Sequence, residues 1–281
     1  MKEFDLRNKI YRIIYRGKGL EFEDYQDYSP DDDASNIDWK ASLRAQKTIV
    51  KRYKEERDLE IMFVIDISEN MILGSVDKLK CEYVAELVTA LSHLIITSND
   101  KIGYLLFSDK VREFVPPNRG FNHFYRFIDK LSDPEIYGGS SEINEAFKFA
   151  LDNFKKPIQA VIFVSDFIRM REDDSLKDNL FLISNKFETT AIMVKDLLDK
   201  SLPMVDRELV VEDPVSGQQI LINPKRAGKI YERNALEQEN FVRDIFKKSN
   251  VDLLRITTDK DFVFPLSMFL MERVEARGVI V

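Results

Sequence analysis

The side chains best placed to do chemistry are three oxygen-bearing residues that follow one apolar segment. Asp66, Ser68 and Asn70 stand at alternate positions directly after residues 59–65. That segment has too few polar positions to alternate, so it predicts a strand buried on both faces of a sheet. Carboxylate, hydroxyl and amide oxygens are ligands that suit a hard divalent cation such as Mg2+. The motif therefore indicates a cation site at the end of a buried strand.

Two further apolar segments end in the same kind of residue. Ser108-Asp109 follows residues 101–107, and Ser165-Asp166 follows residues 160–164. In an open parallel sheet, ligands bind in the crevice outside the carboxyl ends of the strands. We therefore expect these polar ends to lie along one edge of the sheet.

The rest of the chain alternates helices with strands. Apolar residues at i, i+3 and i+4 predict a long helix over 76–97, and Ser141 occupies the N-cap position of a helix over 142–154. Further helices are expected over 121–131, 176–187, 225–248 and 262–273, and further strands over 48–53, 111–115, 189–194 and 251–256. This order predicts an α/β fold with a mostly parallel sheet covered by helices on both faces.

Two parts of the chain depart from that order. Residues 1–57 read as an N-terminal helical and loop extension packed on the main domain, with an amphipathic helix over 3–16 and an acidic, turn-rich segment around Asp31-Asp32-Asp33. Residues 58–281 form the main domain. Within it, two short apolar segments flank Asp213-Pro214-Val215-Ser216-Gly217, which predicts a β-hairpin insertion near 207–222.

Composition narrows the functional classes. The 281 residues carry a net charge of −7, which argues against a nucleic-acid partner because phosphate binding requires clustered Lys and Arg. Cys81 is the one cysteine, so an internal disulfide is excluded. The N-terminus lacks a signal-peptide core, and no apolar run approaches the roughly 20 residues of a transmembrane segment. We expect a cytoplasmic protein.

The polar loop residues resemble a known domain. Asp66-x-Ser68-x-Asn70, Ser141 and Asp166 resemble the metal-ion-dependent adhesion site of a von Willebrand factor A domain. In that site a D-x-S-x-S turn, a Thr from a second loop and an Asp from a third loop surround a cation. The spacing to Ile143 favours Ser141 over Ser140 as the counterpart of the Thr.

More of the sequence resembles one bacterial family that carries such a domain, the domain of unknown function 58. The motifs that carry this resemblance are Tyr28-Ser29-Pro30-Asp31-Asp32, Ile37-Asp38-Trp39-Lys40-Ala41-Ser42, Glu55-Glu56-Arg57-Asp58, Phe107-Ser108-Asp109-Lys110, Val115-Pro116-Pro117, Ser165-Asp166-Phe167, Glu212-Asp213-Pro214 and Thr257-Thr258-Asp259. Together they span about residues 21–273. The resemblance implies a von Willebrand factor A-like main domain.

The resemblance also implies how a cation would be held. Ser68, Asn70 and Ser141 would be direct ligands of Mg2+, Mn2+ or Ca2+, while Asp66 and Asp166 would hold metal-bound water. Asn70 replaces the second Ser of the pattern and Ser141 replaces the Thr, so the geometry is expected to differ. If these residues only cap helices at the sheet edge, no metal binds.

The expected function is protein binding and not catalysis. Family members are thought to act as adaptors or co-chaperones of MoxR-type AAA+ ATPases, which makes such an ATPase the expected partner, with membrane-associated proteins as possible clients. Hydroxyl ligands leave an ion electron-poor, so a partner's carboxylate can complete its coordination. Partner contacts are predicted at residues in the same loops, namely Glu69, Gly139, Ser140 and Phe167.

Two alternatives compete with this interpretation. A metal-dependent phosphohydrolase also places an Asp after a buried strand, but it needs a second Asp two residues later, where this chain has Ser68. Neither histidine, His93 or His123, has a recognisable catalytic setting, and no P-loop is present. The third interpretation is a scaffold whose long helix over 225–248 binds another subunit.

Overall fold

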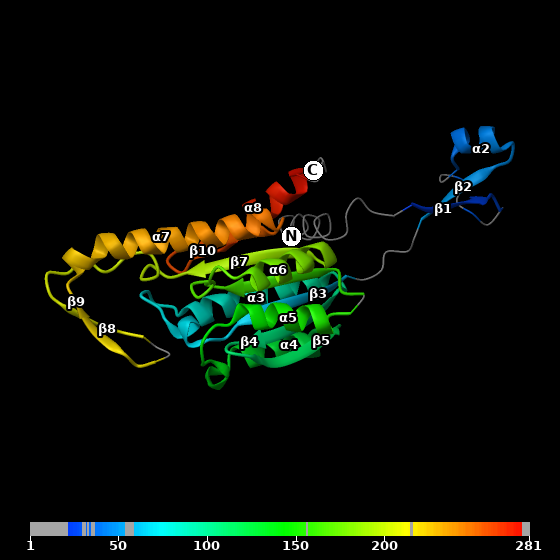
Figure 1. The fold of residues 1–281 in the computed structure, drawn as a ribbon. Helices are drawn as coiled ribbons and strands as arrows, with labels where there is room; N and C mark the ends of the chain where they lie inside the picture. The colour runs from blue at the N-terminus through cyan, green and yellow to red at the C-terminus, as the bar shows by residue number, and fades with distance from the viewer. Residues whose placement is uncertain are drawn as a thin grey trace.

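The computed structural model describes residues 22–29, 32, 34, 37–53, 59–155, 157–213 and 216–276 (Figure 1). The helix expected over 3–16, Asp31 and Asp33 lie outside these residues. Asp32 accepts a hydrogen bond from the backbone N–H of Ser29 at 2.8 Å, so it closes a local turn.

The centre of the molecule is a six-stranded sheet in the order β10-β7-β6-β3-β4-β5. Its strands are β3 (Glu60–Asp66), β4 (Lys101–Phe107), β5 (Val111–Asn118), β6 (Ala160–Ser165), β7 (Glu188–Lys195) and β10 (Asp252–Thr257). All neighbours pair in parallel except β4 and β5, which form the antiparallel pair at one edge. The three most apolar segments, β3, β4 and β6, are adjacent, because strands buried on both faces belong in the middle of a covered sheet.

Helices cover both faces of this sheet, as predicted (Figure 1). On one face α3 (Lys80–Thr97), α4 (Phe121–Leu131) and α8 (Val263–Ala276) contribute to a core that includes Ile61, Phe63 and Ile65 of β3. On the other face α5 (Ile143–Asn153), α6 (Asp174–Lys186) and α7 (Pro224–Lys248) pack on Met62 and Val64. Alternate residues of β3 thus serve two separate apolar cores.

The first helix of the main domain is shorter than its apolar spacing suggests. It begins at Lys80 and not at residue 76, because Glu82 accepts a hydrogen bond from the N–H of Leu79 at 2.9 Å and so fixes the N-terminal turn there. This start places the side chain of Lys80 at the amino-terminal end of α3, beside the carboxyl ends of the strands.

The N-terminal extension contains a small unit of its own. Strand β1 (Phe22–Asp27) pairs antiparallel with β2 (Ile49–Tyr53), and helix α2 (Trp39–Ala45) is capped by Asp38, which accepts hydrogen bonds from two N–H groups of its first turn. The acidic composition of 21–38 predicts turns throughout, so β1 is missed by sequence reasoning. The packing of residues 1–57 on the main domain stays a prediction.

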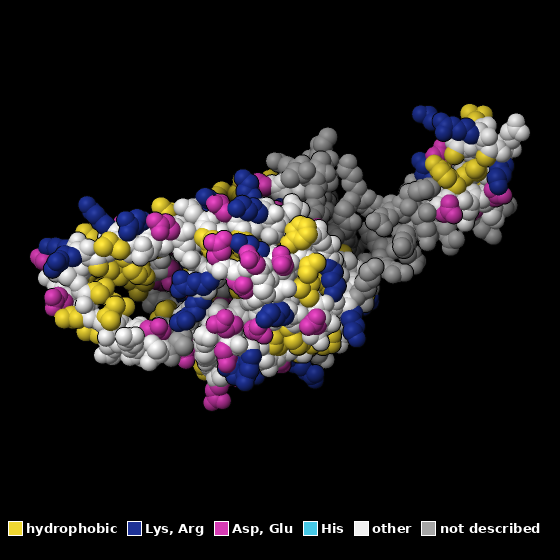
Figure 2. Space-filling view, viewed as in Figure 1, with side chains coloured by type: hydrophobic (Ala, Val, Ile, Leu, Met, Phe, Trp, Pro, Cys, Tyr) yellow, Lys and Arg dark blue, Asp and Glu magenta, His cyan; other side chains and the backbone are white. Residues whose placement is uncertain are grey.

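A β-hairpin follows β7, as predicted, at the edge of the sheet where the parallel strands end. It consists of β8 (Leu209–Glu212) and β9 (Gln219–Ile222), paired from Leu209 opposite Ile222 to Glu212 opposite Gln219. Figure 2 shows hydrophobic side chains gathered around the hairpin and the start of α7. The exposed apolar side chains of these elements include Val210, Ile220, Leu221 and Ile230.

No helix in the described part of the chain is long and apolar enough to cross a membrane.

Candidate functional site

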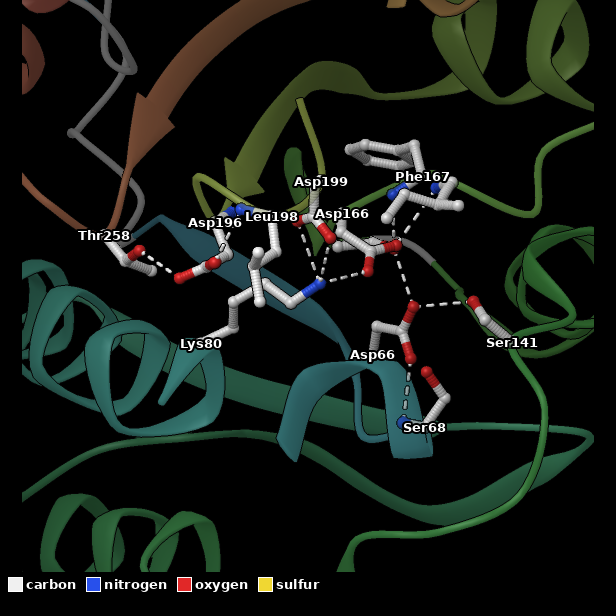
Figure 3. A network of polar contacts seen from close by, with 12 residues as sticks. Asp66, Ser68, Lys80, Ser141, Asp166, Phe167, Asp196, Leu198, Asp199 and Thr258 are labelled. Atoms are coloured by element: carbon white, nitrogen blue, oxygen red, sulfur yellow. Dashed lines mark hydrogen bonds and ion pairs between the residues drawn. The ribbon is translucent and has the colours of Figure 1, made fainter. Parts of the chain in front are cut away.

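The ends of β3 and β6 bring the predicted site residues together. The two strands are parallel neighbours with Ile65 opposite Val164, so Asp66 and Ser165 end their strands side by side. Asp166 follows Ser165 at once. Figure 3 shows Asp66 and Asp166 among the polar contacts at the carboxyl edge of the sheet.

Asp66 is the centre of this network and is fully buried. Its Oδ2 accepts hydrogen bonds from the hydroxyl groups of Ser141 and Ser165, each at 2.6 Å. Its Oδ1 accepts a hydrogen bond from the backbone N–H of Ser68 at 2.9 Å. Burial raises the pKa of Asp66, and the nearby carboxylate of Asp166 raises it further. A cation bound here would therefore relieve an unfavourable buried charge.

Ser141 reaches Asp66 from the loop before α5. The N-cap of α5 is Glu142, without a side-chain capping bond, so the predicted capping role of Ser141 is wrong. The loop is fixed by backbone hydrogen bonds from Gly138 to Ile67 at 2.9 Å and from Glu69 to Gly139 at 3.0 Å. These bonds hold the hydroxyl of Ser141 over the end of β3, where it donates to a carboxylate and leaves its oxygen lone pairs available.

Ser68 is the N-cap residue of a short 3-10 helix, η2 (Glu69–Ile72), that follows β3, and Asn70 lies on this helix. Both are buried, with 0% and 7% of their surfaces exposed. The Oγ of Ser68 makes no hydrogen bond among the described residues, and neither does Oε2 of Glu69. A buried polar atom without a hydrogen-bond partner is energetically unfavourable. The Oγ of Ser68 is therefore a candidate ligand for a cation beside Asp66. The donor set fits a hard cation.

Asp166 has a partner that sequence reasoning missed. Its Oδ1 accepts a hydrogen bond from the N–H of Ile168 at 3.0 Å, and its Oδ2 lies 2.7 Å from Nζ of Lys80. Lys80 is fully buried and also lies 3.0 Å from Oδ2 of Asp199. Burial lowers the pKa of Lys80, but the two carboxylates outweigh that effect and the net shift is upward. Asp166 is therefore paired to an ammonium, in addition to any role toward metal-bound water.

The signal for Lys80 is present in the sequence. Its position precedes Val84, Leu87 and Leu91 by four, seven and eleven residues, so it lies on the apolar stripe of α3. A lysine on the buried stripe of a helix requires a buried anion. The sequence cannot indicate which carboxylate supplies it.

The network continues beyond Lys80 into the loop after β7. Oδ2 of Asp199 accepts a hydrogen bond from the N–H of Asp196 at 2.8 Å. Asp196 in turn accepts hydrogen bonds, each at 2.9 Å, from the N–H groups of Ser75 and Leu198 and from the hydroxyl of Thr258. The ends of β3, β6, β7 and β10 are thus joined through one set of carboxylates.

Phe167 does not have the role predicted for it. Its side chain is 2% exposed, and its ring packs edge-on against Phe246 with centroids 5.0 Å apart. Its backbone has a φ of 52°, stabilised by a hydrogen bond from its N–H to Oγ of Ser165 at 3.0 Å. Phe167 therefore fixes the turn after β6 and cannot offer its ring to a partner. Glu69, Gly139 and Ser140 are partly exposed, and their contact with a partner stays a prediction.

The site offers hydroxyl, amide and carboxylate oxygens. Among the described residues, no group of three His, Cys, Asp or Glu side chains could hold a metal ion, so a cation would rely on hydroxyl and amide oxygens. His123 Nε2 lies 2.8 Å from the carbonyl oxygen of Ile102, near the start of β4 and hence at the opposite edge of the sheet. The arrangement can bind a cation and an acidic group.

Comparison with known proteins finds relatives in sequence and in structure. The uncharacterized protein Rv1480 of Mycobacterium tuberculosis is 24% identical over 267 residues, which cover 92% of this chain and 80% of that protein. The conserved hypothetical protein BatB of Bacteroides thetaiotaomicron superposes with a TM-score of 0.50 at 14% identity, covering 78% of this chain and 98% of that chain. The VWA domain of SpRpn10 aligns with a TM-score of 0.43 at 13% identity, covering 80% of this chain and 100% of that domain.

The predicted α/β class is confirmed: the chain has a mostly parallel six-stranded sheet covered by helices on both faces. The family described as "Protein of unknown function DUF58" matches residues 24–241, which is most of the chain, so the chain belongs to that family.

Proposed function

We propose that this protein is a non-enzymatic protein-binding module whose site at the carboxyl edge of the sheet takes a divalent cation and, through it, an acidic side chain of a partner. The observation that carries the proposal is the Oγ of Ser68. It is buried beside Asp66 and has no hydrogen-bond partner in the described part of the chain. A bound cation would satisfy this atom and the buried carboxylate together.

The residues of the site would have two roles, as ligands of the ion and as supports of those ligands. Ser68, Asn70 and Ser141 would ligate the ion through neutral oxygens, while Asp66 holds Ser141 in place by accepting a hydrogen bond from its hydroxyl. Neutral ligands leave most of the ionic charge uncompensated, which favours a carboxylate from outside as a further ligand. When bound, Mg2+, Mn2+ or Ca2+ supplies the positive charge that attracts that carboxylate.

The phosphohydrolase alternative is less well supported. A carboxylate nucleophile must be open to substrate, whereas Asp66 is fully buried and both of its oxygens already accept hydrogen bonds. Position 68 carries a hydroxyl in place of the carboxylic acid that such chemistry requires. Binding without turnover is the simpler role for these groups.

The proposed binding site also suggests a role for the protein in the cell. We infer an adaptor or co-chaperone of a MoxR-type AAA+ ATPase in the cytoplasm, and this inference rests on family resemblance. The exposed apolar side chains around the hairpin and the start of α7 supply a second surface at the same edge of the sheet, which supports a partner-facing role for that edge.

Calorimetric titration of Mg2+ and Mn2+ into the protein tests the cation. Ser68→Ala and Asp66→Ala should weaken binding by at least about tenfold, because one removes a ligand and the other removes its support. Ser140→Ala is the matched control, since Ser140 is a neighbouring loop serine that we do not assign as a ligand. Identical heats for the wild type and Ser68→Ala would refute the cation site.

A second experiment tests the partner. The protein and a MoxR-type ATPase from its own host are coexpressed and copurified, with and without a chelator. Recovery that depends on Ser68 and on the divalent ion supports the adaptor role, and failure to recover the ATPase under any condition refutes it.

A further inference from the structure

The site already contains a cation of its own. The ammonium of Lys80 lies 2.7 Å from Asp166 and 3.0 Å from Asp199, and the side chains of Lys80 and Asp166 are fully buried (Figure 3). Asp166 is therefore neutralised without any metal. A divalent ion held by Ser68 and Ser141 would be a second positive charge close to the same carboxylate.

Lys80 cannot leave this position for solvent. It is the first residue of α3, its N–H donates to the carbonyl of Leu73 at 3.1 Å, and none of its surface is exposed. A buried ammonium needs a carboxylate. Lys80 has two of them, Asp166 and Asp199, so it can give up one and retain the other.

We propose that Lys80 is the resident cation of the site, that it competes with a divalent ion for Asp166, and that it shifts toward Asp199 when the ion binds. This inference rests on the proposed cation site. The repulsion between two buried positive charges supplies the driving force, and Asp199 supplies the alternative position. Because coupling between two ligands is reciprocal, whatever pulls Lys80 toward Asp199 also tightens binding of the ion.

The competition would reach the surface through the loop after β7. Asp199 accepts a hydrogen bond from the N–H of Asp196, which is part of this loop. When Lys80 moves closer to Asp199, its ammonium therefore competes with that N–H for the same carboxylate. The loop carries Leu197 and Leu198, which are 43% and 40% exposed. The hydroxyl of Tyr231 donates to the carbonyl of Leu198 at 2.6 Å, which links the loop to α7. The state of the ion thereby alters an apolar surface beside the hairpin.

Lys80→Gln removes the resident charge and keeps an amide that can donate hydrogen bonds to both carboxylates. We expect Mn2+ to bind this variant at least about tenfold more tightly than the wild type, because the ammonium that contacts Asp166 is then removed. Lys78→Gln is the matched control, because it removes the same charge two positions away. Lys78 pairs with Glu86 at the surface, so its replacement should leave the affinity for Mn2+ unchanged. Equal affinity of Lys80→Gln and the wild type would overturn the inference and leave the cation site standing.

Wild-type protein provides a second measurement if Lys80→Gln does not fold. In a titration with diamagnetic Mg2+, the 13Cε signal of Lys80 should move with the calorimetric midpoint, while that of Lys78 stays fixed. A stationary Lys80 signal during proven Mg2+ binding contradicts the inference alone. Absence of any heat with Mg2+ or Mn2+, in the wild type and in Lys80→Gln, refutes the proposed cation site and this inference together.

Discussion

Lys80 and Asp166 are 86 positions apart in the sequence, yet Nζ of one lies 2.7 Å from Oδ2 of the other and neither side chain is exposed. This ion pair joins the start of α3 to the end of β6. The desolvation cost of burying two charges can exceed their attraction, so the pair by itself is weak evidence for stability. Its consequence is positional, because it joins the N-terminal end of α3 to the turn after β6.

Removing Lys80 should therefore be costly. Lys80→Met leaves Asp166 and Asp199 without their shared counter-ion, and we expect the free energy of unfolding to fall by about 3–5 kcal/mol. Urea denaturation monitored by circular dichroism measures this change. Lys78→Met, which breaks the exposed pair with Glu86, should cost no more than about 1 kcal/mol. Asp166→Asn added to Lys80→Met should recover part of the loss, and a purely additive double variant would contradict the coupling.

The sequence predicted the fold, and the meeting of the ends of β3 and β6 at one edge of the sheet, because both depend on local patterns. The uniformly apolar segments of β3 and β6 require a covered parallel sheet, and Asp66 and Asp166 follow these segments directly. Two parallel neighbours end at the same edge whatever the details of packing, so the polar ends meet there.

Other features of the site depend on long-range contacts that no local pattern shows. Lys80 lies on an apolar stripe, but only the assembled sheet shows that Asp166 and Asp199 are its partners. The position of Phe167 directly after a site residue predicts partner binding, yet its ring packs against Phe246 of α7. Ser141 has the spacing of an N-cap, but Asp66 offers its hydroxyl a charged acceptor.

Ser68 and Ser165 should respond in opposite ways to the loss of their hydroxyls. Ser165 donates to Asp66 and accepts from the N–H of Phe167, so Ser165→Ala removes one of two hydrogen bonds to Oδ2 of Asp66, leaves the N–H of Phe167 without this acceptor, and should cost about 1–3 kcal/mol of unfolding free energy. Ser68 Oγ has no hydrogen-bond partner in the described residues, so Ser68→Ala should be neutral or slightly stabilising in a chelator. Thermal and urea unfolding of both variants, each with and without Mn2+, checks the contrast. Equal destabilisation of the two variants in a chelator would show that Ser68 Oγ makes a contact of its own.

The stability contributed by Asp196 should depend on pH. Burial raises the pKa of Asp196, but hydrogen bonds from Ser75, Leu198 and Thr258 outweigh burial and hold the pKa below 3.8. A folded-state pKa below the unfolded one means that this contribution is complete above about pH 4 and is lost as the pH falls through the folded-state value. Asp196→Asn should therefore unfold more easily than the wild type by about 1–3 kcal/mol at neutral pH.

The difference in unfolding free energy between the wild type and Asp196→Asn should then become smaller as the pH falls. Urea midpoints at about pH 6, 4 and 3 give the comparison directly. Asp174→Asn is the control, because the side chain of Asp174 is 98% exposed and should give the same midpoint as the wild type throughout. If the difference in urea midpoint between the wild type and Asp196→Asn stays constant down to the lowest pH, the ionised form of Asp196 does not stabilise the fold.

Gly139 should tolerate no side chain, for two separate reasons. Its φ is 81°, which an L side chain rarely adopts, and a Cβ there would lie 3.0 Å from Oδ1 of Asp109 and 3.2 Å from Nη2 of Arg112. Gly217 in the hairpin has a φ of 67° and open space around its Cβ, so it isolates the backbone effect. We expect Gly217→Ala to cost about 1 kcal/mol and Gly139→Ala about 1–3 kcal/mol more, because Gly139→Ala also strains the Asp109–Arg112 pair.

The location of this strain makes the measurement informative about the site. The carbonyl of Gly139 accepts a hydrogen bond from the N–H of Glu69 at 3.0 Å, so a shift of Gly139 is passed to the 3-10 turn that carries Asn70. Gly139→Ala should therefore weaken Mn2+ binding as well as stability, while Gly217→Ala should affect stability alone. Gly139→Ala could instead lower stability and still bind Mn2+ as tightly as the wild type does. That result would show that the loop before α5 and the turn after β3 move independently, so that Mn2+ binding does not require the two segments to be held in a fixed relative position.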